Sequence, residues 1–122
     1  MPETEKLVLM VTHGPSEPEL ATLPFALAGA AVASDVEVVM GFQSDGCLLM
    51  TKGGADNVAA PGFTPLRDLV QLLREMGAQF LVCSPCLVAH QLPADQLIEG
   101  TEVVAAGRFV AEITSATNCL VY

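Results

Sequence analysis

The chain has 122 residues, of which 52% are hydrophobic and only 16% are charged. A chain of this length forms a single domain, residues 1–122, whose core needs no disulfide bond. The 14 acidic and 5 basic residues leave a net charge of −9, which repels phosphate backbones and argues against nucleic acid as a partner. The high apolar fraction predicts a homo-oligomer that hides part of its surface between subunits.

The N-terminal segment lacks the features of a secretory signal, because residues 2–6 are acidic and lead directly into an apolar run. The longest uncharged stretch, residues 20–34, is interrupted by Pro24 and is too short to span a bilayer. Four cysteines without a signal fit a reducing compartment, where a Cys-x-x-Cys pair is catalytic or metal-binding rather than structural. We therefore expect a cytoplasmic protein with no membrane segment.

The first half of the chain predicts two strands and two helices. Residues 7–12 form a continuous apolar run that is typical of a buried strand. A helix over residues 16–33 follows, with Ser16 as its expected cap, and residues 36–40 form the second strand. Ser44 or Asp45 is then expected to cap a short helix that includes Cys47 and ends at two glycines.

The second half of the chain continues the alternation of helices and strands. Thr64 is the expected cap of a helix over residues 65–76, which Gly77 terminates. The remaining predicted elements are a strand over residues 79–82, a short helix over 87–90, a strand over 101–106, a helix over 107–115 and a last strand over 118–122. This order predicts an α/β protein, with a five-stranded parallel sheet in a three-layer α/β/α arrangement.

The pair of cysteines in Cys83–Ser84–Pro85–Cys86 is the strongest indication of function, because it joins the third predicted strand to a helix. A sulfur at the start of a helix faces backbone N–H groups and the positive end of the helix dipole. That position favours the thiolate, the nucleophilic form of cysteine, and lowers its pKa. Cys83 is thus predicted to be a nucleophile, and Cys86, one turn along, either resolves its product or packs in the core.

Other polar side chains also follow predicted strands, and in open parallel sheets ligands bind at the carboxyl ends of the strands. We therefore expect His13, Asp45 and Ser84 to contact the substrate. Alternatives stay open for the first two, since His13 suits a backbone-bonded turn and Asp45 suits a helix cap. Cys47 is either a third thiol of the site or a packed helix residue.

Several segments together resemble the DsrE/DsrF-like family of small sulfur-relay proteins, which includes TusD-type subunits. They are the strand, turn and acidic helix of residues 7–19, the Phe42-x-x-Asp45–Gly46-x-x-Leu49-x-x-Lys52 segment, Phe80–Leu81–Val82–Cys83, and residues 97–104. The resemblance implies a DsrEFH-like α/β/α fold and assembly into dimers, trimers or hexamers. It also implies that Cys83 carries a persulfide, as in a sulfurtransferase, and passes it between sulfur donor and acceptor proteins without a cofactor.

Three other functions remain as alternatives to a persulfide carrier. Cys83 and Cys86 form a Cys-x-x-Cys pair that could act in dithiol–disulfide exchange, although thioredoxin-like proteins place theirs near the first βαβ unit. A zinc site on the same cysteines would need a second ligand pair, which the sequence lacks, so we expect no metal. The third alternative is a non-catalytic subunit that keeps the fold of active relatives.

Overall fold

A computed structural model describes residues 4–122 and contains one parallel sheet. The strands are β1 (Lys6–Val11), β2 (Glu37–Phe42), β3 (Gln79–Cys83), β4 (Thr101–Val104) and β5 (Asn118–Val121), in the order β4-β3-β2-β1-β5. The helices are α1 (Pro18–Ala33), α2 (Leu66–Glu75), α3 (Ser84–Ala89) and α4 (Ala106–Thr114), with 3₁₀ turns η1 (Ser44–Met50) and η2 (Ala94–Gln96). Every strand pair is parallel, as predicted.

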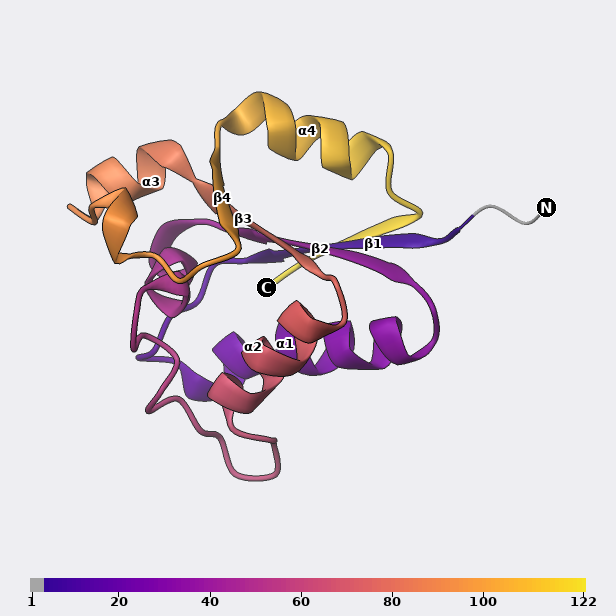
Figure 1. Cartoon of the computed structure of the whole chain (residues 1–122), viewed down its shortest axis with the longest axis horizontal. Coiled ribbons are helices and arrows are strands. Elements are labelled where there is room, and N and C mark those ends of the chain that lie inside the picture. The colour runs from indigo at the N-terminus through magenta and orange to yellow at the C-terminus, as the bar shows by residue number, and fades with distance from the viewer. Residues whose placement is uncertain (1–3) are drawn as a thin grey trace.

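The helices form a layer on each side of this sheet. Figure 1 shows α1 and α2 together on one side of the sheet, and α4 on the other. The short helix α3 continues directly from the end of β3 and lies toward the same side as α4. The predicted α/β fold with a five-stranded parallel sheet in three layers is thus confirmed.

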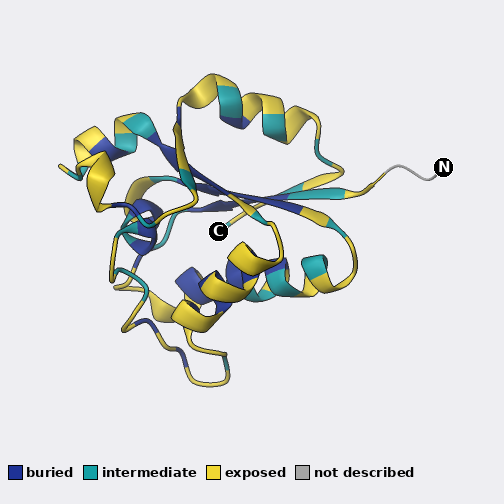
Figure 2. Cartoon of the chain, viewed as in Figure 1, coloured by how far each residue is buried: buried dark blue, intermediate teal, exposed yellow. Residues whose placement is uncertain are grey.

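The core lies between the three central strands and helix α1. Strands β1, β2 and β3 are almost wholly buried, whereas the edge strands β4 and β5 are largely exposed (Figure 2). Phe25 of α1 packs against Phe42 and Phe80 of the sheet, with ring centroids 5.8 and 6.5 Å away. Phe42 and Phe80 are themselves 5.8 Å apart and nearly perpendicular, a favourable aromatic geometry. This cluster fixes α1 over β2 and β3.

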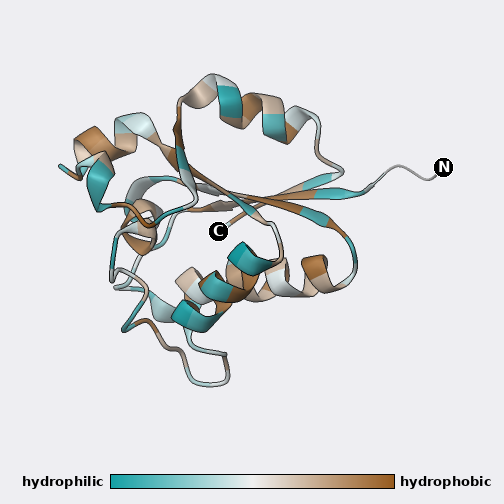
Figure 3. Ribbon diagram, in the orientation of Figure 1, coloured by the Kyte–Doolittle hydropathy of each residue, from teal (hydrophilic) through white to brown (hydrophobic). Residues whose placement is uncertain are grey.

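Helix α2 covers part of the apolar surface of α1. The hydrophobic side chains of α2 repeat at helical spacing, and four of them are buried, namely Leu66, Leu69, Val70 and Leu73. Figure 3 shows the resulting alternation of hydrophilic and hydrophobic segments along α2, next to the mostly hydrophobic α1. No helix in the described part of the chain is long and apolar enough to cross a membrane.

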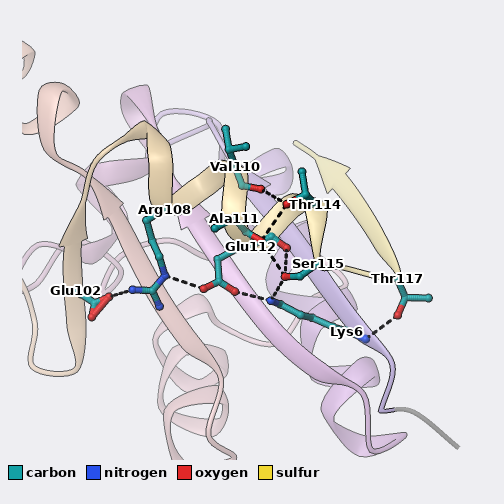
Figure 4. Close-up of polar contacts among 9 residues, drawn as sticks. All are labelled: Lys6, Glu102, Arg108, Val110, Ala111, Glu112, Thr114, Ser115 and Thr117. Atoms are coloured by element: carbon teal, nitrogen blue, oxygen red, sulfur yellow. Dashed lines mark hydrogen bonds and ion pairs between the residues drawn. The ribbon is translucent and has the colours of Figure 1, made fainter.

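Helix α4 is tied across the opposite face by a polar network (Figure 4). Glu112 of α4 pairs with Lys6 at the start of β1 and accepts a hydrogen bond from Arg108 at 2.7 Å. Arg108 also pairs with Glu102 of β4. The hydrogen bond from Lys6, followed by that from Arg108, lowers the pKa of Glu112 below its ordinary value. The network therefore links α4 to β4 and β1, two strands that β3 and β2 separate in the sheet.

The predicted caps are wrong at three helices. Helix α1 begins at Pro18 with Glu17 at the cap position, α2 has Pro65 at that position, and η1 has Gln43, none with a capping side-chain hydrogen bond. Ser16, Thr64 and both candidates for the third element, Ser44 and Asp45, therefore do not cap these elements. The prolines explain two of the shifts, because a proline near a helix start lacks the N–H that a cap would satisfy.

Of two other predicted boundaries, the end of α2 is correct and the end of β4 is not. The end of α2 at Gly77 is confirmed, since this residue has the positive φ of 88° that glycine adopts readily. The fourth strand ends at Val104 rather than at residue 106, because α4 already begins at Ala106. The apolar run of residues 103–106 extends from the strand into the helix, and periodicity does not separate the two elements.

Candidate functional site

The candidate site forms where η1 and α3 meet at the carboxyl ends of β2 and β3. These strands are neighbours, with Phe42 opposite Val82 in the register, so the residues that follow them emerge side by side. Strand β3 ends at Cys83, which occupies the N-cap position of α3. The segment after β2 turns at once into η1, whose Ser44 lies against α3. Both cysteines of the predicted pair, Cys83 and Cys86, therefore lie close to a third cysteine, Cys47 of η1.

Cys83 accepts the backbone hydrogen bond that its position predicts, but the residue is poorly exposed to solvent. The backbone N–H of Cys86 donates to Cys83 Sγ at 3.3 Å. Pro85 takes an early position in α3, as predicted, and its missing N–H costs no helical hydrogen bond there. Only 9% of Cys83 is accessible. Its sulfur therefore lies at the inner wall of the site.

The expected low pKa of Cys83 is wrong. Burial raises the pKa of the Cys83 thiol above its ordinary value, the side chain of Cys86 raises it further, and the N–H of Cys86 opposes both only in part. Helix α3 has only six residues, so its dipole contributes little against the loss of solvation. At neutral pH this fold keeps Cys83 mainly as the neutral thiol.

This direction of shift predicts how alkylation depends on pH. Only the thiolate reacts, so we expect the rate at Cys83 to be low near neutral pH and to rise roughly tenfold per pH unit past about 8.5, the ordinary cysteine value. Iodoacetamide labelling across this range, with peptide fragmentation to separate Cys83 from Cys86, measures the profile. A rate that levels off below about pH 8 would contradict burial as the dominant influence.

Cys86 lies near Cys83 and a third thiol, Cys47. Its half-buried side chain influences the pKa of both, and Cys86 Sγ accepts a hydrogen bond from the backbone N–H of Ser44 at 3.4 Å. Ser44 directs this N–H from a left-handed conformation, with φ of 52°, which is uncommon for a residue other than glycine. Strain of this kind often marks functional positions. No pattern in the sequence indicates this donor.

The sequence left open whether Cys47 is a third thiol of the site or a packed residue. It is fully buried, and its thiol donates to the carbonyl of Phe42 at 3.4 Å. Burial, with smaller contributions from Cys86 and Cys83, raises the pKa of Cys47 to about 12. Cys47 is thus both a packed residue of η1 and a neighbour of the site, and it remains protonated at neutral pH.

His90 and Asp45 add a polar contact between the same two elements. His90, the C-cap of α3, has Nε2 3.8 Å from Asp45 Oδ1 of η1. The sequence predicts His90 as the end of the short helix, where a cation is favourable, and indicates no chemistry for it. The pair connects α3 to η1 next to the thiols and leaves the Asp45 side chain about half exposed.

The remaining predicted site residues have surroundings that differ from those of the thiols. His13 follows β1, one strand beyond β2, and its Nδ1 is 3.5 Å from Thr12 Oγ1. Ser84 is half-buried in the first turn of α3 and lines a shallow hollow with Val103. Cys119 lies in β5 against the core, where burial raises its pKa. Within residues 4–122, no group of three His, Cys, Asp or Glu side chains is arranged to hold a metal ion.

A parallel sheet with a Cys-x-x-Cys pair between its third strand and the following helix defines a small α/β protein whose candidate site is built on thiols. Residues 5–122 match the model of the DsrE/DsrF-like family, and the chain therefore belongs to this family. The resemblance found in the sequence is confirmed over nearly the whole chain.

Individual relatives support the fold. The chain is 28% identical over 106 residues to the uncharacterized protein MJ0760 of Methanocaldococcus jannaschii, and the match covers 87% of this chain but only 38% of that longer protein. The crystal structure of the YchN protein from E. coli superimposes with a TM-score of 0.81 at 19% identity, covering 98% of this chain and all of YchN. MTH1491 of Methanobacterium thermoautotrophicum gives 0.73 at 20% identity, covering 97% and 99%.

Proposed function

We propose that this protein carries sulfane sulfur as a persulfide on Cys83, in the manner of a sulfurtransferase or sulfur-relay subunit. The observation that carries the proposal is the N–H of Cys86, which donates to Cys83 Sγ at 3.3 Å and can stabilise negative charge that develops there. Family membership supports the same residue, because the resemblance implies a persulfide on the cysteine after the third strand. The three free thiols at this edge provide the chemistry.

The proposed transfer is an exchange of one sulfur–sulfur bond for another. The Cys83 thiolate attacks the outer sulfur of a donor persulfide, a new bond forms between that sulfur and Cys83 Sγ, and the donor leaves as its thiolate. Delivery to an acceptor thiolate is the same step in reverse order. No external oxidant is needed, since one persulfide is consumed for each one formed.

Proteins that donate and accept sulfur are the proposed partners. Because Cys83 Sγ is buried, the transferable sulfur of a Cys83 persulfide would lie one bond further from the core than Sγ itself. The Cys86 side chain, which is more exposed, lies beside that position and can assist release or receive the sulfur. A cytoplasmic, reducing location would keep these thiols free between transfers.

Persulfide mapping tests the proposal. The reduced protein is incubated with inorganic polysulfide, digested without reductant and analysed by mass spectrometry. We expect the mass of one added sulfur atom on Cys83. No added sulfur on any cysteine would refute the proposal and leave dithiol–disulfide exchange and the non-catalytic subunit as the remaining functions.

Dithiol–disulfide exchange is the second candidate, and the proximity of Cys86 to Cys83, whose Sγ accepts the Cys86 N–H at 3.3 Å, favours it. In that reaction the two thiols form a disulfide and pass two electrons and two protons to an oxidant. A redox titration with glutathione distinguishes the candidates, since a reversible Cys83–Cys86 disulfide without persulfide formation would support this second function.

We also propose that copies of this chain associate through the face that carries α4 and the edge strands. Of the ten exposed large hydrophobic side chains in residues 4–122, six lie on these elements and on α3: Val88, Val103, Val110, Ile113, Leu120 and Val121. Segments of α3 and α4 are accordingly exposed in Figure 2 and hydrophobic in Figure 3. Exposed large apolar side chains in this number are typical of subunit interfaces.

Light scattering of the purified chain tests this association against the subunit mass of 12.7 kDa. We expect a multiple of that mass, and we expect Val110→Asp, a change at a side chain that is 57% exposed, to shift it toward the single chain. Leu72→Asp on α2, a side chain 44% exposed on the other face, is the matched control and should leave the mass unchanged. A lone chain in the unmodified protein would refute the proposal.

A further inference from the structure

A cavity of about 640 Å³ lies away from the thiols, between α2 and the segments that flank it. Its other walls are the segment after η1, including Thr51 and Gly53, and the turn before β4, at Gly100. Leu49, Val70 and Ile98 supply an apolar lining. A concave site of this size with a few polar groups is typical of binding sites for small molecules.

Two arginines of α2 provide the positive charge of this cavity. Arg67 and Arg74 lie two turns apart on one face of the helix, and both line the cavity. Within residues 4–122, neither guanidinium has a carboxylate within 4.0 Å or a hydrogen-bond partner, whereas Arg108 on α4 is engaged by two carboxylates. In a chain of net charge −9, unpaired arginines beside an apolar wall have donors free for an external anion.

The guanidinium of Arg74 lies beside the turn before β4. A Cβ atom on Gly100 would lie 3.6 Å from Arg74 Nε and 3.8 Å from Nη2, so the guanidinium is a neighbour of this glycine. Gly100 has φ of 89°, a conformation that side-chain-bearing residues rarely adopt. The turn therefore leaves room for the exposed Arg74 side chain at the cavity wall, where its donors are free.

Two acidic residues limit the charge that the cavity accepts. Asp56 and Glu75 also line it, and Glu75 accepts a hydrogen bond from Gln71 at 3.3 Å. These carboxylates would repel a dianion such as a phosphate monoester more strongly than a monoanion. A planar carboxylate also matches the fork of donors on a guanidinium.

We propose that this cavity binds a small organic monocarboxylate, with its apolar part against the half-buried Ile98 and its carboxylate on Arg74. This site is separate from the proposed sulfur chemistry, and each can fail without the other. Arg67 supplies a second donor group along the same helix face.

Titration of the full chain with hexanoate, followed through the backbone amide NMR signals of Gly53 and Gly100, tests the site. We expect saturable shifts at both glycines, and weaker binding by about tenfold or more in Arg74→Gln, because a charged hydrogen bond is lost. Arg108→Gln, outside the cavity, is the matched control and should bind hexanoate as the unmodified chain does.

The length-matched ligands hexan-1-ol and hexyl phosphate separate the contributions. Weak or no binding of both supports a carboxylate site. Equal binding of hexan-1-ol would show that the arginines do not select the ligand, and tighter binding of hexyl phosphate would assign the site to phosphates instead. The absence of shifts at Gly53 and Gly100 with hexanoate, for example because a second copy covers the cavity, would overturn the proposal.

Discussion

Replacement of Cys83 by serine is expected to abolish sulfur loading by polysulfide, with a loss of essentially all the added mass at the site. A serine hydroxyl remains protonated near neutral pH and does not form a persulfide, while its size and its ability to accept the Cys86 N–H are similar to those of the thiol. The change therefore removes the nucleophile with little effect on the fold. The measurement is intact-protein and peptide mass spectrometry after loading.

Cys119→Ser is the matched control for this prediction. Cys119 is also partly buried, and burial also raises its pKa, but it lies in the edge strand β5, which β2 and β1 separate from β3. Loading of this variant should equal that of the unmodified protein. Sulfur found on Cys86 in Cys83→Ser would identify Cys86 as the carrier and contradict the assignment to Cys83.

Replacement of Gly46 by alanine is expected to lower the free energy of unfolding by about 3 kcal/mol or more, through overpacking against backbone. A Cβ atom on Gly46 would lie 2.1 Å from the carbonyl oxygen of Val11 and 2.8 Å from its carbon. The same oxygen accepts the N–H of Gln43 at 3.0 Å, so a shift of η1 away from β1 would also break that hydrogen bond.

The Gly46→Ala change should also disturb the thiols, because η1 carries both Ser44 and Cys47. A displaced η1 would withdraw the Ser44 N–H from Cys86 Sγ, which we expect to alter the alkylation rate of Cys86. Gly29→Ala in α1 is the matched control, since a Cβ there meets nothing within 4 Å. That variant should be more stable by about 0.5–1 kcal/mol, the helix preference of alanine over glycine.

Urea unfolding of both variants measures these effects. A Gly46→Ala protein that unfolds at the same denaturant concentration as the unmodified chain would show that η1 does not depend on its close approach to β1. Gly14 makes a similar approach to Asp45, with a distance of 2.5 Å from a built Cβ to the carbonyl oxygen. The loop after β1 and η1 therefore pack backbone against backbone at the edge that holds the thiols.

The strands were predictable because their signal is local. Each is a short apolar run between turn residues, and a parallel sheet covered on both faces favours such runs over alternation. The helix starts were less predictable, since Pro18 and Pro65 compete with the neighbouring Ser16 and Thr64 for the same boundary. The position of Cys83 at the end of β3 and the start of α3 was predictable for the same local reason.

The chemistry of the site depended on residues that are distant along the chain. Cys47 and Ser44 reach Cys86 only because β2 pairs with β3 and because Gly46 lets η1 lie against β1. His90 meets Asp45 for the same reason. None of these contacts leaves a pattern in the sequence.

The sequence by itself determined the order of strands and helices, the family and the place of the thiol pair, since these follow from local patterns of apolar residues, turns and cysteines. The tertiary structure decided the protonation of Cys83, because burial sums the surroundings of a side chain from every packed element and here outweighs one amide and a short helix. It also decided the cavity lined by Arg74, whose walls come from three separate segments.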